Sequence, residues 1–324
     1  MNSLDTLKQQ FEIFLEQQIP DKNPKNLYAP IKYVLQNGGK RIRPLLVLLS
    51  AKSFGVRTEN ALAAAAAIET FHNFTLIHDD IMDKAPIRRG LATVHEKWDE
   101  NLAILSGDTM LIWAYKMLEQ YDGKTYKKLS SLLNQTAIEV CEGQQMDMDF
   151  EQRNDVSLSE YLEMIRLKTA VLIGAALSFG GIVANADKKN LENISQFGIN
   201  LGIAFQIQDD YLDTYGKVSN FGKQIGGDII DRKKTFLYIN ALQLANANDR
   251  ADLLKLFANK QIDNEKLIKK TINLFDNYNI KTIVKQQIDN YTQKSLNYLS
   301  ATGFSDKEKE FWKHFALQLM HRIN

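Results

Sequence analysis

Helix-breaking residues are concentrated in a few parts of this sequence. All five prolines lie within the first 86 residues, and no glycine occurs between Gly227 and Gly303. The long stretches between breakers are rich in Leu, Ala, Lys, Gln and Glu, which favour helices. No linker divides the chain. The sequence therefore predicts an all-α fold and a single helical domain over residues 1–324.

Charge balance and cysteine content narrow the functional classes. The chain carries 40 basic and 39 acidic residues, so it does not favour general nucleic-acid binding. Cys141 is the only cysteine, and we expect it to be a buried, small apolar residue in a cytoplasmic protein. Residues 1–18 carry charges throughout, unlike a secretory leader. The longest uncharged run, 169–186, contains glycines and is short for a membrane span, so it predicts a core helix and no transmembrane segment.

An aspartate-rich motif occupies residues 76–83, Leu-Ile-His-Asp-Asp-Ile-Met-Asp. In a helix, Asp79 and Asp83 lie one turn apart on the same face, where like charges repel each other. Apolar residues precede the motif, and partial burial of these carboxylates would require a nearby cation. A solvated acidic face would explain this motif equally well if it stood alone.

A second motif at residues 206–213, Gln-Ile-Gln-Asp-Asp-Tyr-Leu-Asp, repeats the same aspartate spacing. Two copies of an uncommon pattern, each in an apolar helical context, are poorly explained as solvated surface. Carboxylate oxygens suit Mg²⁺ or Ca²⁺, and Mg²⁺ usually completes its coordination with water and substrate phosphate. If the two helices face each other across a cleft, the motifs would bind a phosphorylated substrate through magnesium.

Basic residues occur at positions that suit phosphate. Residues 38–44, Gly-Gly-Lys-Arg-Ile-Arg-Pro, end one predicted helix and open the next, where backbone N–H groups favour an anion. An ordinary basic loop would also explain that segment. Arg88 and Arg89 follow the first aspartate motif and can bind phosphate oxygens in pairs. His72 lies two turns before Asp79, where packing and ligand binding are equally good explanations.

Apolar periodicity places most of these motifs on helices. It predicts a turn at 20–30, a loop at 86–90, helices over 3–18, 31–36, 45–50, 59–83, 101–120, 125–149 and 191–215, and several amphipathic helices in 237–324. Ser157 and Glu160 form a capping-box pattern that opens a helix carrying Lys168 and Thr169. Glycines next to lysines in residues 221–228 suit a flap over a polyanion, although a solvated surface loop has the same composition.

In this order, the motifs resemble those of the trans-type isoprenyl diphosphate synthases, or polyprenyl synthetases. The resemblance covers residues 30–240 and rests on the segments 38–44, 79–83, 88–90, 168–169, 205–213, 222–223 and 233–235. It implies the isoprenoid synthase fold, with ten or more helices around a deep central cavity, and a homodimer. Each segment alone is a weak signal, whereas all of them in family order are specific.

The resemblance also implies a role for each motif. Two to three Mg²⁺ ions would be bound, together with the diphosphate of an allylic substrate, by Asp79, Asp80, Asp83, Asp209, Asp210 and Asp213. Further contacts to this diphosphate would come from Arg88, Lys168, Lys223 and Lys233. The reacting carbon would lie beside Thr169 and Gln206. Isopentenyl diphosphate, the second substrate, would be bound by Lys40, Arg43, His72 and Arg89. The catalytic set would be Asp79, Asp83, Arg88, Lys168, Asp209 and Lys223.

The reaction implied is ionisation, condensation and elimination. The allylic C–O bond breaks, the isopentenyl double bond attacks the resulting carbocation, and a proton is lost to the departing pyrophosphate. Magnesium and the surrounding cations would stabilise the charge that builds up on the leaving group. A dry apolar pocket would protect the carbocation from water.

Residues before Asp79 are expected to set the length of the product. The family pattern points to the fifth position before this aspartate, Phe74, whose ring would stop the chain early. A helical wheel instead favours Thr75, which lies about 40° from Asp79, compared with about 140° for Phe74. Phe74 and the short aspartate motif resemble geranylgeranyl-type enzymes. A C20 product is therefore predicted, ahead of C15 farnesyl diphosphate and longer chains.

Three other classes of protein fit less well. The second metal motif of a class I terpene cyclase usually mixes Asn, Ser or Thr with Glu, and a cyclase would have no use for a second diphosphate site at 38–44. A non-catalytic subunit of a heteromeric synthase would lose aspartates that this chain keeps. A di-iron carboxylate bundle needs Glu-x-x-His pairs, which the sequence lacks.

Overall fold

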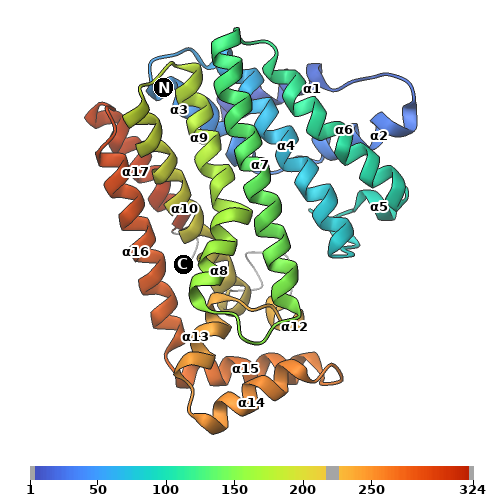
Figure 1. Ribbon diagram of the computed structural model, residues 1–324, viewed down its shortest axis with the longest axis vertical. Helices are drawn as coiled ribbons and strands as arrows, with labels where there is room; N and C mark the ends of the chain where they lie inside the picture. The colour runs from blue at the N-terminus through green and yellow to red at the C-terminus, as the bar shows by residue number, and fades with distance from the viewer. Residues whose placement is uncertain (1–3, 217–225, 321–324) are drawn as a thin grey trace. The chain divides into compact units, whose positions relative to one another are not determined.

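The computed structural model describes residues 4–216 and 226–320 (Figure 1). These residues are mostly helical, which confirms the predicted all-α class. Their one sheet is a two-stranded hairpin. Contacts divide the chain into a first compact unit, residues 1–134 with 175–192, and a second, residues 135–174 with 193–324. The single domain and the central cavity stay predictions.

More than ten helices lie in the described residues. The first unit contains α1 (Leu4–Gln18), α2 (Lys25–Gln36), α3 (Ile42–Ser53), the 3₁₀ turn η1 (Thr58–Ala61), α4 (Leu62–Met82), β1 (Ile87–Arg88), β2 (Leu91–Ala92), α5 (Val94–Lys97) and α6 (Glu100–Leu118). The second contains α8 (Leu158–Ile165), the π turn η2 (Arg166–Ala170), α12 (Gly227–Ile230), α13 (Phe236–Leu244), α14 (Ala247–Ala258), α15 (Asn264–Asn277), α16 (Ile280–Ser300) and α17 (Asp306–Met320). The unit boundaries fall inside α7 (Gly123–Glu151), α9 (Val171–Val183) and α10 (Lys188–Tyr215).

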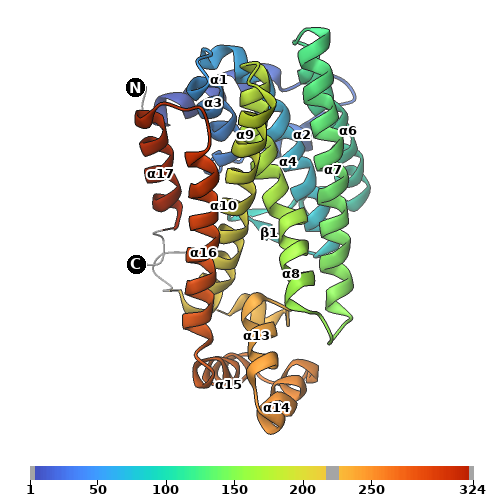
Figure 2. The same ribbon diagram turned by 60° about the vertical axis from the view of Figure 1, so that its left-hand side comes forward.

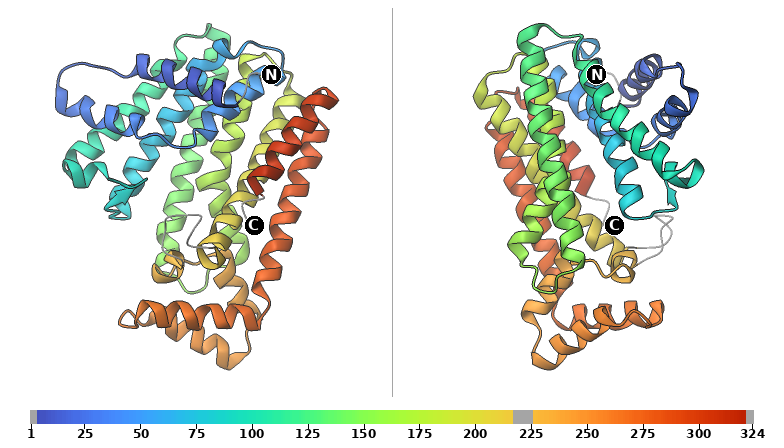
Figure 3. Two further views of the ribbon diagram at one scale, coloured as in Figure 1. Left: turned by 180° about the vertical axis from the view of Figure 1, so that it is seen from behind. Right: turned by 45° about the vertical axis from the view of Figure 1, so that its right-hand side comes forward.

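The core of the first unit is built around α4. This helix packs along α6 and also contacts α3 (Figure 1; Figure 3, right). Its alanine-rich segment, residues 63–67, is buried, and such small side chains allow neighbouring helices to approach closely. Support on both sides fixes the direction of α4, and its C-terminal end carries the first aspartate motif.

The core of the second unit holds α10 against the C-terminal helices. The Phe197 and Trp312 rings lie edge to face with centroids 5.8 Å apart, and Ser295 Oγ donates to the Phe197 carbonyl at 2.8 Å. α16 and α17 run side by side, and α13 packs against α14, α15 and α16 (Figure 2; Figure 3, left). These contacts position α10, which carries the second aspartate motif.

Two predicted boundaries are wrong. The expected turn at 20–30 is partly helical, because α2 begins at Lys25 and includes Pro30. An interior proline removes one helix hydrogen bond, but burial of Pro30 together with Ile31 and Leu35 opposes that cost. The expected loop at 86–90 contains β1, which pairs with β2. The turn residues Arg89 and Gly90 both have positive φ, as this type of two-residue hairpin requires.

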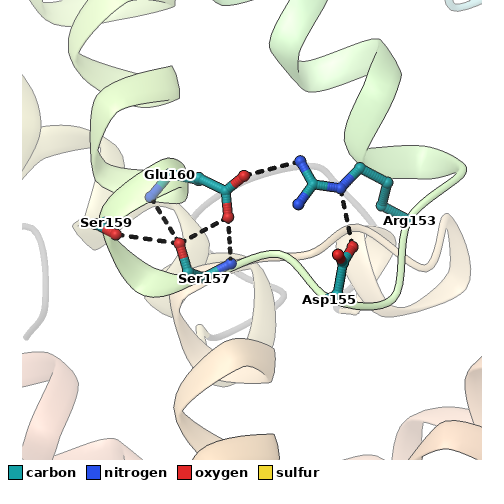
Figure 4. A network of polar contacts seen from close by, with 5 residues as sticks. All are labelled: Arg153, Asp155, Ser157, Ser159 and Glu160. Carbon is teal, nitrogen blue, oxygen red and sulfur yellow. Dashed lines mark hydrogen bonds and ion pairs between the residues drawn. The ribbon is translucent and has the colours of Figure 1, made fainter.

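The predicted capping box at the start of α8 is confirmed (Figure 4). Ser157 Oγ accepts from the Glu160 backbone N–H, and the Glu160 carboxylate accepts from the Ser157 backbone N–H at 2.9 Å. Hydrogen bonds from Ser157 lower the pKa of Glu160 to about 2. Arg153 also bonds Glu160 at 2.8 Å and Asp155 at 2.9 Å, which fixes the chain entering α8.

Cys141 is exposed on α7, so the expectation of a buried cysteine is wrong. Its neighbours in sequence are helical, and the face of α7 on which it lies is decided by packing that the local sequence does not specify. The continuous helix Leu158–Val183 is the one described segment with the length and apolarity to cross a membrane. In the most apolar 18-residue stretch of this helix, 78% of the residues are buried inside the protein, as expected for the predicted core helix.

Candidate active site

The first aspartate motif ends α4. Asp80 is buried and accepts from Arg88 Nε at 2.6 Å. Burial raises the pKa of Asp80, and the Arg88 charge opposes that rise. Asp79 is partly exposed, and Asp83 caps the helix on the surface. Asp79 and Asp83 are therefore more accessible to a metal than Asp80, whose carboxylate is occupied by Arg88.

The four residues predicted to bind the second substrate lie together in the first unit. Lys40, Arg43, His72 and Arg89 line a pocket of about 500 Å³, here called the cation pocket. Arg89 Nη1 donates to the Gly38 carbonyl at 2.9 Å. At Gly39, a Cβ would lie 3.0 Å from the Arg89 guanidinium carbon, and φ is +117°. Glycine is thus required where the chain passes Arg89.

Arg43 and His72 form a bonded pair in this pocket, with Arg43 Nη1 3.1 Å from His72 Nε2. Burial and the nearby arginines lower the pKa of His72 well below its usual value. His72 is therefore neutral at pH 7 and accepts from Arg43. Burial lowers the pKa of Arg43 to about 10, so the guanidinium remains charged at neutral pH.

A buried ion pair that the sequence did not reveal borders the cation pocket. Arg41 Nη1 lies 2.5 Å from Glu69 Oε1, and the two side chains are 3% and 2% exposed. Arg41 also donates to the Leu35 carbonyl, which ties the end of α2 to α3 and α4. Glu69 could have been suspected as a carboxylate inside an apolar helix, but its partner lies 28 residues away.

In the second aspartate motif, the three carboxylates have different surroundings. Asp210 is buried and accepts from Tyr161 Oη at 2.5 Å, from Gln206 Nε2 at 3.3 Å and from the Phe236 N–H at 3.4 Å. Burial and the Asp228 charge raise the pKa of Asp210 to about 8. Asp213 accepts from the Asp228 N–H at 2.9 Å, and Asp209 is exposed. Asp209 is the most accessible of the three.

A second pocket, here called the lysine pocket, lies in the second unit. Its lining includes the predicted residues Lys168, Thr169, Gln206, Asp210 and Lys233, and the unpredicted residues Asp147, Tyr161, Asp228 and Lys234. Lys168 Nζ lies 2.5 Å from Asp147 Oδ2, and Thr169 Oγ1 donates to Gln206 Oε1 at 3.3 Å. Lys233 Nζ lies 3.5 Å from Asp228 Oδ1. Lys223 falls outside the described residues.

The unpredicted members of the lysine pocket have only weak sequence signals. Asp147 follows Gly143 by one helical turn on α7, and nothing local indicates that it contacts Lys168. Tyr161 looks like an ordinary core residue of an amphipathic helix, and Asp228 lies in the segment interpreted as a flap. Their role became visible only when helices distant in sequence were placed together.

Phe74 and Thr75, the two candidates for setting product length, differ in their surroundings. Phe74 is buried, and its ring centroid lies 5.7 Å from that of Phe71 and 4.8 Å from that of His78. Thr75 is partly exposed, and its hydroxyl donates to the His72 carbonyl at 2.8 Å. Gly107 on α6 makes room for His78, because a Cβ there would lie 2.3 Å from His78 Nε2.

The donor chemistry of both motifs fits magnesium. Within residues 4–216 and 226–320, no group of three or more His, Cys, Asp or Glu side chains could hold a metal by itself. Mg²⁺ usually takes one or two carboxylates and completes its octahedron with water and phosphate oxygens. Accessible carboxylates such as Asp79 and Asp209 suit this mode of binding.

Comparisons with known proteins identify the family. The family model described as polyprenyl synthetase matches residues 24–275. The chain belongs to this family. It is thus a trans-prenyltransferase, as the motifs predicted, and polyprenyl synthetases are generally magnesium-dependent.

Three relatives illustrate the similarity. The geranylgeranyl diphosphate synthase of Methanosarcina mazei is 42% identical over 231 residues, which are 71% of each chain. The geranylfarnesyl diphosphate synthase of Natronomonas pharaonis is 40% identical over 245 residues, which are 70% of this chain and 72% of that one. A crystal structure of a geranylgeranyl pyrophosphate synthase is 45% identical and matches 100% of both chains with a TM-score of 0.95.

Proposed function

We propose that this polyprenyl synthetase condenses isopentenyl diphosphate with an allylic diphosphate to give C20 all-trans geranylgeranyl diphosphate. The observation that carries the proposal is that the chain has two phosphate-suited pockets with different charge patterns. The cation pocket contains Lys40, Arg43 and Arg89, and its carboxylate, Glu69, is bonded to Arg41. This excess of positive charge suits a diphosphate that is bound directly by cations.

The lysine pocket suits a diphosphate that arrives with metal. Lys168 and Lys233 there are accompanied by the carboxylates of Asp147, Glu151 and Asp228. A bare diphosphate would meet several carboxylates, whereas a magnesium-bound diphosphate presents positive charge to them. We assign the allylic diphosphate to this pocket and isopentenyl diphosphate to the cation pocket.

The aspartates would divide the binding of two to three magnesium ions according to their accessibility. Asp79, Asp83 and Asp209 are the direct ligands in this proposal. Asp80 and Asp210 are engaged by Arg88 and Tyr161, and together with Asp213 they support the metal-binding residues. When bound, magnesium stabilises the charge that builds up on the leaving diphosphate.

Protein side chains perform the remaining steps of the proposed reaction. Arg88, Lys168, Lys223 and Lys233 hold the allylic diphosphate while its C–O bond breaks. Thr169 and Gln206, which share a hydrogen bond, lie beside the reacting carbon and keep it in position for attack by the isopentenyl double bond. The proton lost at the end goes to the departing pyrophosphate, so no side-chain base is required.

For product length, we propose that Phe74 limits the chain to C20. The buried Phe74 ring is braced by Phe71 and His78, so it can resist a growing apolar chain. The similarity to geranylgeranyl diphosphate synthases supports C20, and the similarity to a geranylfarnesyl diphosphate synthase makes a longer product the main alternative, with C15 next. Phe74→Ala should lengthen the product, with Thr75→Ala as the matched variant. An unchanged distribution for Phe74→Ala and a longer product for Thr75→Ala would move the assignment to Thr75.

One assay tests the proposed reaction. The purified protein is incubated with isopentenyl diphosphate and labelled C5, C10 or C15 allylic diphosphates, with and without Mg²⁺, and chain length is analysed. We expect magnesium-dependent C20 prenyl diphosphate from each primer. Cyclic hydrocarbon would favour a terpene cyclase, and activity only after addition of a partner protein would favour a non-catalytic subunit.

We also propose a homodimer and a cytoplasmic location. Family membership supports the first, and the single cysteine is consistent with the second. Light scattering should give a mass twice the 37.0 kDa of the chain. A monomeric mass at assay concentration would contradict the homodimer.

A further inference from the structure

The helix that carries Lys168 and Thr169 changes its winding at these residues. α8 and α9 are joined by the π turn η2, whose sequence is Arg-Leu-Lys-Thr-Ala. A π turn is rare, and such turns occur frequently at functional sites. No residue within η2 is a proline or glycine that would distort a helix by itself. The neighbouring helices must therefore stabilise this turn.

On one side, η2 rests against a glycine of α7. A Cβ added to Gly143 would lie 2.3 Å from the Lys168 backbone nitrogen and 2.7 Å from its Cα. Both are backbone atoms, so a side-chain rotation cannot relieve the overlap. The backbone of α7 can approach the π turn this closely only because residue 143 has no side chain.

On the other side, η2 rests against a glycine of α10. A Cβ at Gly202 would lie 2.8 Å from the Ala170 Cα and 2.9 Å from its Cβ. Gly143 and Gly202 are both buried; Gly143 faces the middle of the five-residue turn, at Lys168, and Gly202 faces its last residue, Ala170. The turn is thus seated between two helices that approach it through glycines.

Each glycine is followed, one helical turn later, by the side chain that bonds the π turn. Asp147 is four residues after Gly143 and lies 2.5 Å from Lys168 Nζ. Gln206 is four residues after Gly202 and accepts from Thr169 Oγ1 at 3.3 Å. Residues four apart share a helix face, so close backbone contact and side-chain contact occur on the same side of each helix.

We propose that Gly143 and Gly202 are positioning residues that seat the π turn so that Lys168 and Thr169 reach the allylic substrate. This inference rests on the proposed function of Lys168 and Thr169. A Cβ at position 143 would force the turn away by about 1 Å to restore an ordinary contact of 3.4 Å. A displacement of that size at a reacting centre can lower turnover on the order of 100-fold.

The experiment compares Gly143→Ala and Gly202→Ala with the wild-type protein in the condensation assay. For Gly143→Ala we expect kcat to fall by about 10- to 100-fold and the KM for isopentenyl diphosphate to stay unchanged, since the cation pocket is built from other elements. Gly202→Ala should have a smaller effect, because its Cβ would come only within 2.8 Å of the Ala170 Cα, compared with 2.3 Å from the Lys168 nitrogen for Gly143→Ala. Calorimetry should also show that both variants bind inorganic pyrophosphate with Mg²⁺ more weakly than the wild-type protein does, and that the variant with the lower kcat binds it less tightly.

Gly174→Ala is the matched control. A Cβ there would lie 2.7 Å from Ile199 Cγ1 and 2.9 Å from the Ser195 carbonyl oxygen. This overlap is similar to that at Gly202 and smaller than that at Gly143, but it falls between α9 and α10 outside η2. This variant should lower the Tm and keep the wild-type kcat. If Gly143→Ala does not fold, the inference is tested with Gly202→Ala and the double variant Gly202→Ala/Ala170→Gly. We expect the double variant to recover part of the kcat that Gly202→Ala loses.

The outcomes separate the inference from the proposed function. An inactive wild-type protein would refute the proposed function. If the wild-type protein is active and the folded variants Gly143→Ala and Gly202→Ala keep the wild-type kcat, the inference is overturned. An equal loss of kcat in Gly174→Ala would also overturn it, because general loosening of the helices would then explain the effect.

Discussion

The cation pocket and the lysine pocket contain similar numbers of basic side chains but balance them differently. Among the described residues that line the cation pocket, the one carboxylate is Glu69, and it is bonded to Arg41. In the lysine pocket, Lys168 and Lys233 each face an aspartate, Asp147 or Asp228. Positive charge is therefore concentrated in the first pocket and largely balanced in the second.

This difference corresponds to two ways of binding the same chemical group. A pocket with excess positive charge can bind a bare diphosphate through charge-assisted hydrogen bonds. A pocket whose charges are balanced attracts a bare anion only weakly, and it binds more strongly a diphosphate whose charge is already compensated by metal. An enzyme that must break only one of two diphosphate ester bonds needs such a distinction, because magnesium would then activate only the allylic leaving group.

The largest expected effect tests the metal-dependent side of the comparison. Asp79→Ala should lower turnover on the order of 100- to 1,000-fold while the protein remains folded, because the charge that stabilises the leaving group is lost. Steady-state kinetics and circular dichroism measure the two quantities. Asp252→Ala, at a carboxylate that is 66% exposed, is the control. Retained magnesium-dependent turnover in Asp79→Ala would refute the role of this residue.

A smaller effect is expected when the cation pocket loses one charge. Arg43→Gln should raise the KM for isopentenyl diphosphate by about 10- to 100-fold, since a charge-assisted hydrogen bond contributes about 1.5–3 kcal/mol. The KM for the allylic substrate and the magnesium dependence should not change. Arg57→Gln, at an arginine that is 82% exposed, should resemble wild type. Equal changes in both KM values would show that the two sites are not separated as proposed.

Removal of metal should affect the two substrates unequally. With EDTA, binding of a C10 allylic diphosphate should weaken by about tenfold or more, whereas binding of isopentenyl diphosphate should change little. Calorimetry with each substrate alone measures both affinities. A similar loss for both substrates would mean that the cation pocket also depends on metal, which would remove the difference between the pockets.

The smallest expected effect concerns the neutral histidine of the cation pocket. Burial and the adjacent arginines lower the pKa of His72 in the folded protein. Near pH 6.5 the His72 side chain therefore takes up a proton in the unfolded chain but not in the folded protein. The free energy of unfolding should therefore fall as the pH drops from 7 towards 5, by at most about 1.4 kcal/mol per pH unit from this group. Urea unfolding at pH 5, 6 and 7 should show a flatter dependence for His72→Gln. The exposed His314, changed to Gln, is the control; an unchanged slope in His72→Gln would contradict the assignment.

Much of the candidate site could be predicted because its motifs are local. The aspartate spacing, the arginine pair after Asp83 and the segment 38–44 lie in consecutive residues, and the structure places Lys40, Arg43, His72 and Arg89 in one pocket as expected. The capping box at Ser157 was also predictable, since it joins residues three apart. The different surroundings of Asp79 and Asp80 were not, because they depend on Arg88 in the hairpin.

The sequence by itself determined the all-α class, most helix positions and the family, because helix propensity, apolar period and motif spacing act within one segment. The tertiary structure decided which carboxylate faces which cation. Arg41 and Glu69 are 28 residues apart, Asp147 and Lys168 are 21 apart, and Tyr161 and Asp210 are 49 apart. Such pairs form only when separate helices pack together, and burial then sets their protonation and accessibility. The π turn at Lys168 has the same origin, since glycines on two other helices allow the contacts that hold it.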